Sequence, residues 1–297
     1  MRTYTMTRWV GLGALLAGCA LFAMRVSAEE GQATASPADL ATLQKRLDDL
    51  EKQVASGPQC GQACCDSMCC DPCHCPGVVF GTEMSMLRFH DNIGLADRYN
   101  DLEAAPRIWA GWTTAGGLGA RIRWFDYQDT SSASDIERVR LYTVDMEITD
   151  SFQLGSKWSG LLSGGVRYAE ENDLVHFAID EPLLRNVNSG TGPLLGVELY
   201  RQVTDRFSLF VLGRESLLFG NTSISEGPAA ERVQNTLFAI SEIQLGGEWR
   251  KALNGTAYLF ARTAVEAQWW GGPAILVEFG SRDIGLVGGT MAVGICR

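Results

Sequence analysis

The chain has 297 residues, of which 33 are glycine and only 20% are charged, and its formal net charge is −10 at pH 7. An acidic chain of this kind is a poor candidate for nucleic-acid binding. The sequence contains no glycine-rich phosphate loop and no helix-borne pair of metal ligands. The glycine content and the mean hydropathy of −0.01 favour many short strands and turns.

The N-terminus has the features of a signal peptide. Two arginines accompany an apolar run from Trp9 to Met24, and a small-residue cleavage site, Val26-Ser27-Ala28, follows it. Residues 1–28 are therefore predicted to be removed on export. The alternative is lipoprotein processing that leaves a lipidated Cys19, which is less favoured because the apolar core continues past the cysteine. No later apolar run reaches the roughly 18 residues of a membrane helix, so a membrane-spanning mature protein would use strands.

Residues 29–56 are predicted to form a linker and a short coiled coil. Leucines recur at spacings of three and four from Leu40 to Leu50 among charged residues, and Pro37 stands at the expected start of the helix. Two heptads are marginal alone, so this helix would need a further contact to hold chains together. The alternative is an amphipathic helix that lies on its own barrel.

Residues 57–77 form a cysteine-rich segment. In an exported protein, clustered cysteines predict disulfides. Their number in this segment is odd, which leaves one thiol for the last strand, for another chain or for a metal. The spacings do not match a zinc ribbon or finger, so disulfides are favoured, and neither a metal site nor a cofactor is predicted. The candidates for disulfides or cross-links are Cys60, Cys64, Cys65, Cys69, Cys70, Cys73, Cys75 and Cys296.

Residues 78–297 show the alternation of a membrane barrel. In the stretch from Tyr142 to Thr149, apolar side chains occupy the even positions, and polar or charged side chains occupy the odd ones. Successive side chains of a strand lie on opposite faces, so one face of this strand is apolar and the other is charged. Behind an export signal, this pattern is typical of an all-β, transmembrane barrel whose apolar face contacts lipid.

About ten strands are expected in this region. Short turns alternate with longer connections, which is the layout of an up-and-down antiparallel barrel with both ends on the periplasmic side. The coiled coil and the cysteine-rich segment would then lie in the periplasm. Eight or twelve strands are the alternatives, because residues 274–279 could form a separate strand and the alternation breaks near Gly213. The expected strands are 78–90, 106–114, 117–128, 137–150, 157–169, 193–202, 206–219, 236–249, 256–269 and 284–296.

The charged faces of these strands would line the lumen. Every base in this set is arginine, whose planar group pairs well with carboxylates. An internal ion-pair network and a pore lining are the two interpretations. No catalytic residue is predicted, because His90 and His176 are isolated histidines without a nucleophile motif. The predicted lumen residues are Arg121, Arg123, Asp145, Glu147, Arg167, Glu198, Arg214, Glu242, Glu248, Arg262 and Glu266.

Two further patterns concern the rims of the barrel. Aromatic residues near strand ends predict girdles at the lipid headgroups. The long connections hold many more acids than bases, so they would form either a cation-attracting outer rim or simply solvated loops. The predicted girdle residues are Trp112, Trp124, Trp158, Tyr168, Trp249, Trp269 and Trp270.

Segments 105–112 (APRIWAGW) and 117–127 (GLGARIRWFDY) carry a resemblance to a known family. With residues 141–147, 165–169 and 192–199, they resemble the pore-forming outer-membrane proteins related to the Legionella-type major outer membrane protein. The resemblance implies an outer-membrane barrel with a pore or structural role. The chain departs from the usual outer-membrane barrel at its end, where Ile295-Cys296-Arg297 has no terminal aromatic residue.

Two functions are therefore expected for a protein of the outer membrane. The first is a pore for passive diffusion of small hydrophilic solutes. The second is a structural envelope protein with a plugged lumen, anchored or cross-linked through its coiled coil and cysteines. The expected partners are outer-membrane lipid, other copies of the chain through those two segments, and the cell wall. Nucleic acid is not an expected partner.

Overall fold

The computed structural model describes residues 76–91, 102–129, 138–175, 184–226, 232–254, 257–272, 274–276, 280–281 and 283–297. The predicted signal peptide, the coiled coil and the cysteine-rich segment up to residue 75 lie outside the described residues. Within the described ranges, no helix has the length and hydropathy needed to cross a membrane.

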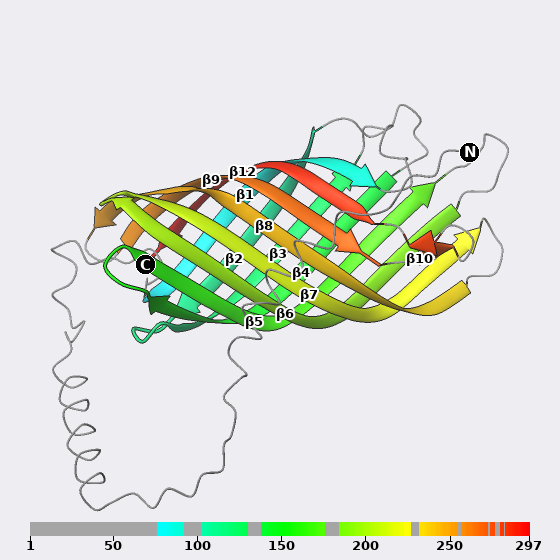
Figure 1. Cartoon of the computed structure of the whole chain (residues 1–297), viewed down its shortest axis with the longest axis horizontal. Coiled ribbons are helices and arrows are strands. Elements are labelled where there is room, and N and C mark those ends of the chain that lie inside the picture. Colours follow the sequence, from blue (N-terminus) through cyan, green and yellow to red (C-terminus); the bar gives the residue numbers. More distant parts are fainter. Residues whose placement is uncertain are drawn as a thin grey trace, which may run out of the picture. The chain divides into compact units, whose positions relative to one another are not determined.

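Ten antiparallel strands close into a barrel, in which β1 and β12 lie side by side (Figure 1). Each strand pairs with its neighbours in sequence, and β12 pairs with both β9 and β1. The predicted ten-stranded, up-and-down architecture is thereby confirmed. The barrel strands are β1 (Gly77–Asp91), β2 (Leu102–Thr113), β3 (Leu118–Asp129), β4 (Arg138–Gln153), β5 (Trp158–Val175), β6 (Leu184–Thr204), β7 (Phe207–Glu226), β8 (Arg232–Asn254), β9 (Ala257–Gly271) and β12 (Ile284–Cys296).

Both ambiguities in the strand count have a structural explanation. The stretch after β9 contains β10 (Ala274–Leu276), which pairs with β11 (Gly280–Ser281) and not with the barrel sheet. In β7, the register with β8 continues without a shift past Gly213. Arg214 therefore lies on the inner face, and Glu215 lies on the outer face, where the Ser241 hydroxyl donates to its carboxylate at 2.5 Å.

Strands β5 to β8 extend beyond their expected ends on the side of the long connections. Residues such as Asn188 and Thr222 remain paired there although both faces of the ladder are polar. Alternation of apolar and polar residues marks only the part of a strand that has one apolar face, so it underestimated these lengths. Glu171 and Asp173, which were expected in a loop, consequently lie in β5 with buried side chains.

Glycines allow close backbone approach in the barrel wall. A Cβ atom at Gly165 would lie 1.9 Å from the carbonyl oxygen of Met146, and one at Gly288 would lie 1.9 Å from that of Met86. No other residue type fits at such distances without moving the neighbouring strand. Both glycines are on the inner side, so they permit bends that the closed sheet requires.

The outer face of the barrel is predominantly apolar. Most of its large apolar side chains are 37–71% exposed, and alternate residues along each strand point inward. The predicted girdle residues Trp112, Trp124, Trp158, Tyr168, Trp249 and Trp269 all lie on this outer face. The expectation for Trp270 was wrong, because it follows Trp269 directly in β9 and its side chain is therefore on the inner face, fully buried.

Candidate functional site in the barrel interior

All eleven predicted lumen side chains lie on the inner face of the barrel. The burial pattern and the cross-strand register place them there together, from β3 to β9. Two of them, Arg121 and Arg262, are partly exposed. The buried members are Arg123, Asp145, Glu147, Arg167, Glu198, Arg214, Glu242, Glu248 and Glu266.

Asp145 lies at the centre of an ion-pair network. Its Oδ1 accepts a hydrogen bond from Arg167 Nε at 2.6 Å, and its Oδ2 accepts from Arg167 Nη2 at 3.0 Å and from Arg214 Nη2 at 2.6 Å. Arg214 also contacts Glu147 and Glu242, and Arg167 contacts Glu242. Because these residues come from β4, β5, β7 and β8, the network joins strands across the interior of the barrel.

Arg107 forms a second part of this network, which the sequence analysis missed. It pairs with Glu83, and its Nη2 lies 2.6 Å from Glu266 Oε1. The Gln244 amide donates to both carboxylates at 3.1 Å. Glu83 and Arg107 each directly precede an apolar residue that faces outward. The alternation of faces along a strand could therefore have predicted that both side chains point inward. Arg250, which pairs with Glu248, was also missed.

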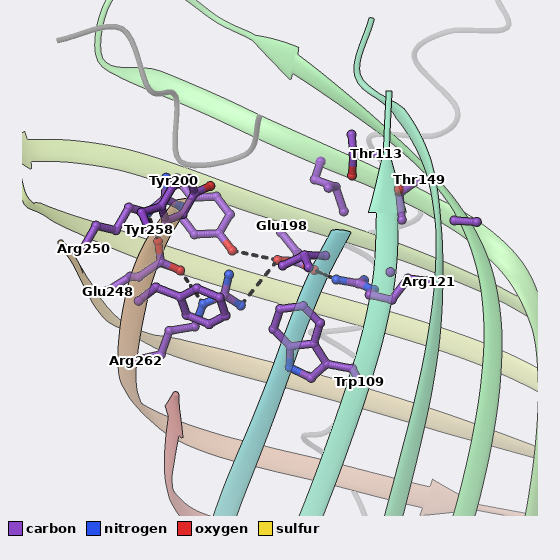
Figure 2. Close-up of a pocket in the computed structure, with 15 residues that line it drawn as sticks. Trp109, Thr113, Arg121, Thr149, Glu198, Tyr200, Glu248, Arg250, Tyr258 and Arg262 are labelled. Atoms are coloured by element: carbon purple, nitrogen blue, oxygen red, sulfur yellow. Dashed lines mark hydrogen bonds and ion pairs between the residues drawn. The ribbon is translucent and has the colours of Figure 1, made fainter. Parts of the chain in front are cut away.

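A pocket lies next to this network, toward the end of the barrel with the short turns (Figure 2). Arg121 reaches Glu198 Oε1 through Nη1 at 2.6 Å and Glu147 Oε2 through Nη2 at 2.9 Å. The Tyr200 hydroxyl donates to the other oxygen of Glu198 at 2.8 Å. The pocket wall is therefore charged, but its carboxylates already have donors.

Arg262 is enclosed by aromatic rings at the pocket wall. Its guanidinium carbon lies 5.2 Å from the ring centroid of Phe260, 5.5 Å from those of Tyr200 and Phe210, and 5.9 Å from that of Trp109. Its Nε donates to Glu248. Cation–π attraction and the carboxylate together hold this side chain across the interior, which narrows the lumen at this level.

An apolar layer fills the interior on the other side of the ion-pair network. Along β1, the inward residues run from Val79 at the pocket through Glu83 in the network to Leu87 and Phe89 in this layer. Nine of the ten barrel strands contribute to it, and its members are only 0–3% exposed. The members are Leu87, Phe89, Ala105, Phe125, Tyr127, Val139, Leu141, Ala169, Leu218, Phe238, Ile240, Trp270, Ile284 and Leu286.

Cys296 is the one cysteine candidate among the described residues. It ends β12 on the inner face, is fully buried and is disulfide-bonded. The candidates Cys60 to Cys75 lie outside the described residues. Within the described ranges, no group of three or more histidine, cysteine or acidic side chains could hold a metal ion.

Comparisons with known proteins find similarity in fold only at low identity. No family model and no curated protein matches the chain. The resemblance to the Legionella-type major outer membrane proteins therefore stays a prediction.

The solved structures that match include the following three. The translocator domain of autotransporter NalP from Neisseria meningitidis has a TM-score of 0.41 at 13% identity, over 88% of this chain and 98% of that one. The N-terminal β-barrel domain of Pseudomonas aeruginosa OprF has a TM-score of 0.30 at 10% identity, over 74% of this chain and 99% of that one. The CymD monoaromatic hydrocarbon channel has a TM-score of 0.32 at 10% identity, over 75% and 89%.

Proposed function

We propose that the protein is an integral β-barrel of the outer membrane. The outer face supports this, because a wall of apolar side chains, most of them 37–71% exposed, would be a large unfavourable surface in water. Lipid removes that cost, and the outward aromatic residues suit the headgroup regions on either side. The predicted signal peptide supplies the route of export.

The first test of this proposal is folding into lipid. Protein without residues 1–28, diluted from urea into phospholipid vesicles, is expected to form a compact band that migrates differently on gels before and after heating. It should also resist added protease. Protein that stays soluble and protease-sensitive in the presence of vesicles would contradict the membrane proposal.

Within the membrane, we propose a structural role with a closed lumen. The apolar layer carries this proposal: its side chains, drawn from nine strands, are at most 3% exposed, whereas an open aqueous channel would keep inner side chains in contact with water. The ion-pair network closes the next level, where Arg107 and Arg167 are also fully buried. Barrels of about eight strands are filled by side chains, while those of about 16 hold an open channel, and ten strands are near the filled limit.

In this role the barrel would anchor the predicted coiled coil and cysteine-rich segment at the membrane. Disulfides through residues 57–77 would then join copies of the chain, aligned by the coiled coil. Non-reducing gels of whole envelopes should show ladders that collapse on reduction. A matched variant that lacks residues 29–77 but keeps Cys296 should still fold into vesicles but give no ladder. Reducible ladders from that variant, or none from the intact protein, would overturn the cross-linking part.

A pore for small hydrophilic solutes is the second candidate. The pocket in Figure 2 favours it, because charged side chains such as Arg121 and Glu198 line it, and Arg121 also pairs with Glu147 of the ion-pair network. Passage would require the apolar layer to separate. Planar-bilayer recording distinguishes the two: the closed barrel is expected to give no stable conductance steps, and reproducible steps from the intact protein would favour the pore.

A further inference from the structure

Arg123 lacks the partners that the other inner arginines have. It lies on the inner face of β3 and is only 5% exposed. Its Nε and Nη1 atoms are buried, and no atom of the described residues accepts a hydrogen bond from them. A buried guanidinium without an acceptor is unfavourable, because its charge and its N–H groups have lost water without replacement.

The nearby carboxylates are occupied by other arginines. Asp145 lies directly opposite Arg123 in the β3–β4 ladder, yet its oxygens accept from Arg167 and Arg214. Glu147 pairs with Arg121 and Arg214. Arg107, Arg121 and Arg214 are themselves close enough to repel the charge of Arg123. The carboxylates of Glu83, Asp145, Glu147 and Glu198 attract Arg123, but each of them already pairs with another arginine. The Nε and Nη1 atoms of Arg123 are therefore donors left without an acceptor among the described residues at this level.

We propose that Arg123 binds a small monovalent anion of the halide class inside the barrel. Such an ion would accept from Nε and Nη1 and would compensate the charge, whereas a water molecule would supply only the acceptor. Arg121 and Trp109 flank Arg123, the first two residues away on β3 and the second directly opposite on β2. Both line the pocket, so the anion would enter from there.

The filled interior sets the size of the ligand. Trp109 and Asp145 occupy the cross-strand positions on either side of Arg123, and both are buried. A single-atom anion needs less room than a phosphate or a carboxylate at this level. The inference concerns the folded barrel alone, so it holds whether the lumen is closed or conducts solutes.

Bromide is a suitable probe. The refolded full chain in detergent micelles would be titrated with sodium bromide against sodium gluconate at constant ionic strength, while the thermal unfolding midpoint is recorded. The midpoint is expected to rise with bromide and to saturate. The variant Arg123→Gln should lose this rise. The variant Arg140→Gln, which removes an arginine on the outer face, should retain it.

The outcomes separate the proposal from general salt effects. A rise that does not saturate, or the same saturable rise in Arg123→Gln, would overturn it. Should Arg123→Gln fail to fold, bromide-soaked crystals of the unchanged protein decide the matter. An anomalous peak beside Nε and Nη1 of Arg123 supports the site, and an ordered water without an anomalous signal there overturns it.

Discussion

Arg167 and Asp145 face each other across the β4–β5 ladder and form a two-point ion pair inside the barrel, with Nε–Oδ1 and Nη2–Oδ2 distances of 2.6 and 3.0 Å. The same two-point contact occurs on the outer face between Arg140 and Asp126, at 3.0 and 2.7 Å. The Arg140 side chain is 48% exposed, whereas that of Arg167 is fully buried. The chain thus holds one kind of ion pair in two environments.

Substitution of the two arginines by methionine should reveal this difference. Arg167→Met leaves Asp145 and Glu242 each short of a partner in the interior, so we expect the free energy of unfolding to fall by about 3–5 kcal/mol. Arg140→Met should cost less than about 1 kcal/mol, because solvent and salt screen its pair. Urea titration of vesicle-folded protein measures both. If the two substitutions lower the free energy of unfolding by similar amounts, the inner ion pairs are accessible to water.

Trp269 and Trp270 offer a second matched pair, since adjacent residues of β9 point to opposite sides of the wall. Trp269 is 45% exposed on the outer face, and Trp270 is fully buried, where its indole N–H donates to Gln268 at 3.2 Å. Trp270→Ala should lower the free energy of unfolding by about 3–5 kcal/mol, since it leaves a cavity in the apolar layer. Trp269→Ala should cost much less.

Fluorescence checks the same pair independently. Brominated lipid chains should quench the fluorescence of Trp269 and should not quench that of Trp270. The contribution of each tryptophan is identified as the emission that disappears in Trp269→Phe or in Trp270→Phe. Equal quenching of both would mean that Trp270 is not enclosed in the barrel.

Alternation predicted the architecture because most strands have an apolar outer face and a polar inner one over much of their length. It assigned the faces of strands such as residues 142–149 correctly, where the inner positions are polar or charged. It could not predict the apolar layer, because Leu87 and Leu141 are apolar inner residues that lie beside apolar or basic outer ones. A side chain that packs against others inside the barrel has the same composition as one that contacts lipid.

The pairing of individual acids and arginines could likewise not be predicted from the sequence. Glu83 meets Arg107 through the register of the neighbouring strands β1 and β2. The contact of Arg107 with Glu266 depends on the barrel closure that brings β9 near β2. The missing partner of Arg123 is a property of that same arrangement. Residue type alone could only show that acids and bases are nearly matched on the inner face.

The position of a new charge along the outer face provides a third prediction. Val265 is an exposed outer residue within β9, and Leu253 is an exposed residue near the end of β8. Val265→Arg should lower the free energy of folding into vesicles by about 2–4 kcal/mol, as expected near the bilayer midplane, while Leu253→Arg should cost about 0–1 kcal/mol near the interface. If both cost the same, the apolar belt does not contact lipid as assigned.

The seam between β1 and β12 provides the last prediction, through the neighbouring glycines Gly288 and Gly289. A Cβ atom at Gly288 would lie 1.9 Å from the carbonyl oxygen of Met86, so Gly288→Ala must push the two closing strands apart. We expect it to lower the free energy of unfolding by at least about 1–3 kcal/mol. At Gly289 the nearest atom, the carbonyl oxygen of Ala264, is 3.7 Å away. Gly289→Ala should therefore be neutral or slightly stabilising.

Urea titration in vesicles and the shift of the heat-modifiable band measure both glycine variants. The seam is where the first and last strands meet, so a strand that is pushed outward there opens the barrel rather than bending it. Loss of the compact band in Gly288→Ala alone is the expected pattern. If Gly288→Ala folds as well as Gly289→Ala, the closing strands do not approach as closely as the Gly288–Met86 contact requires, and the bend at this position has another cause.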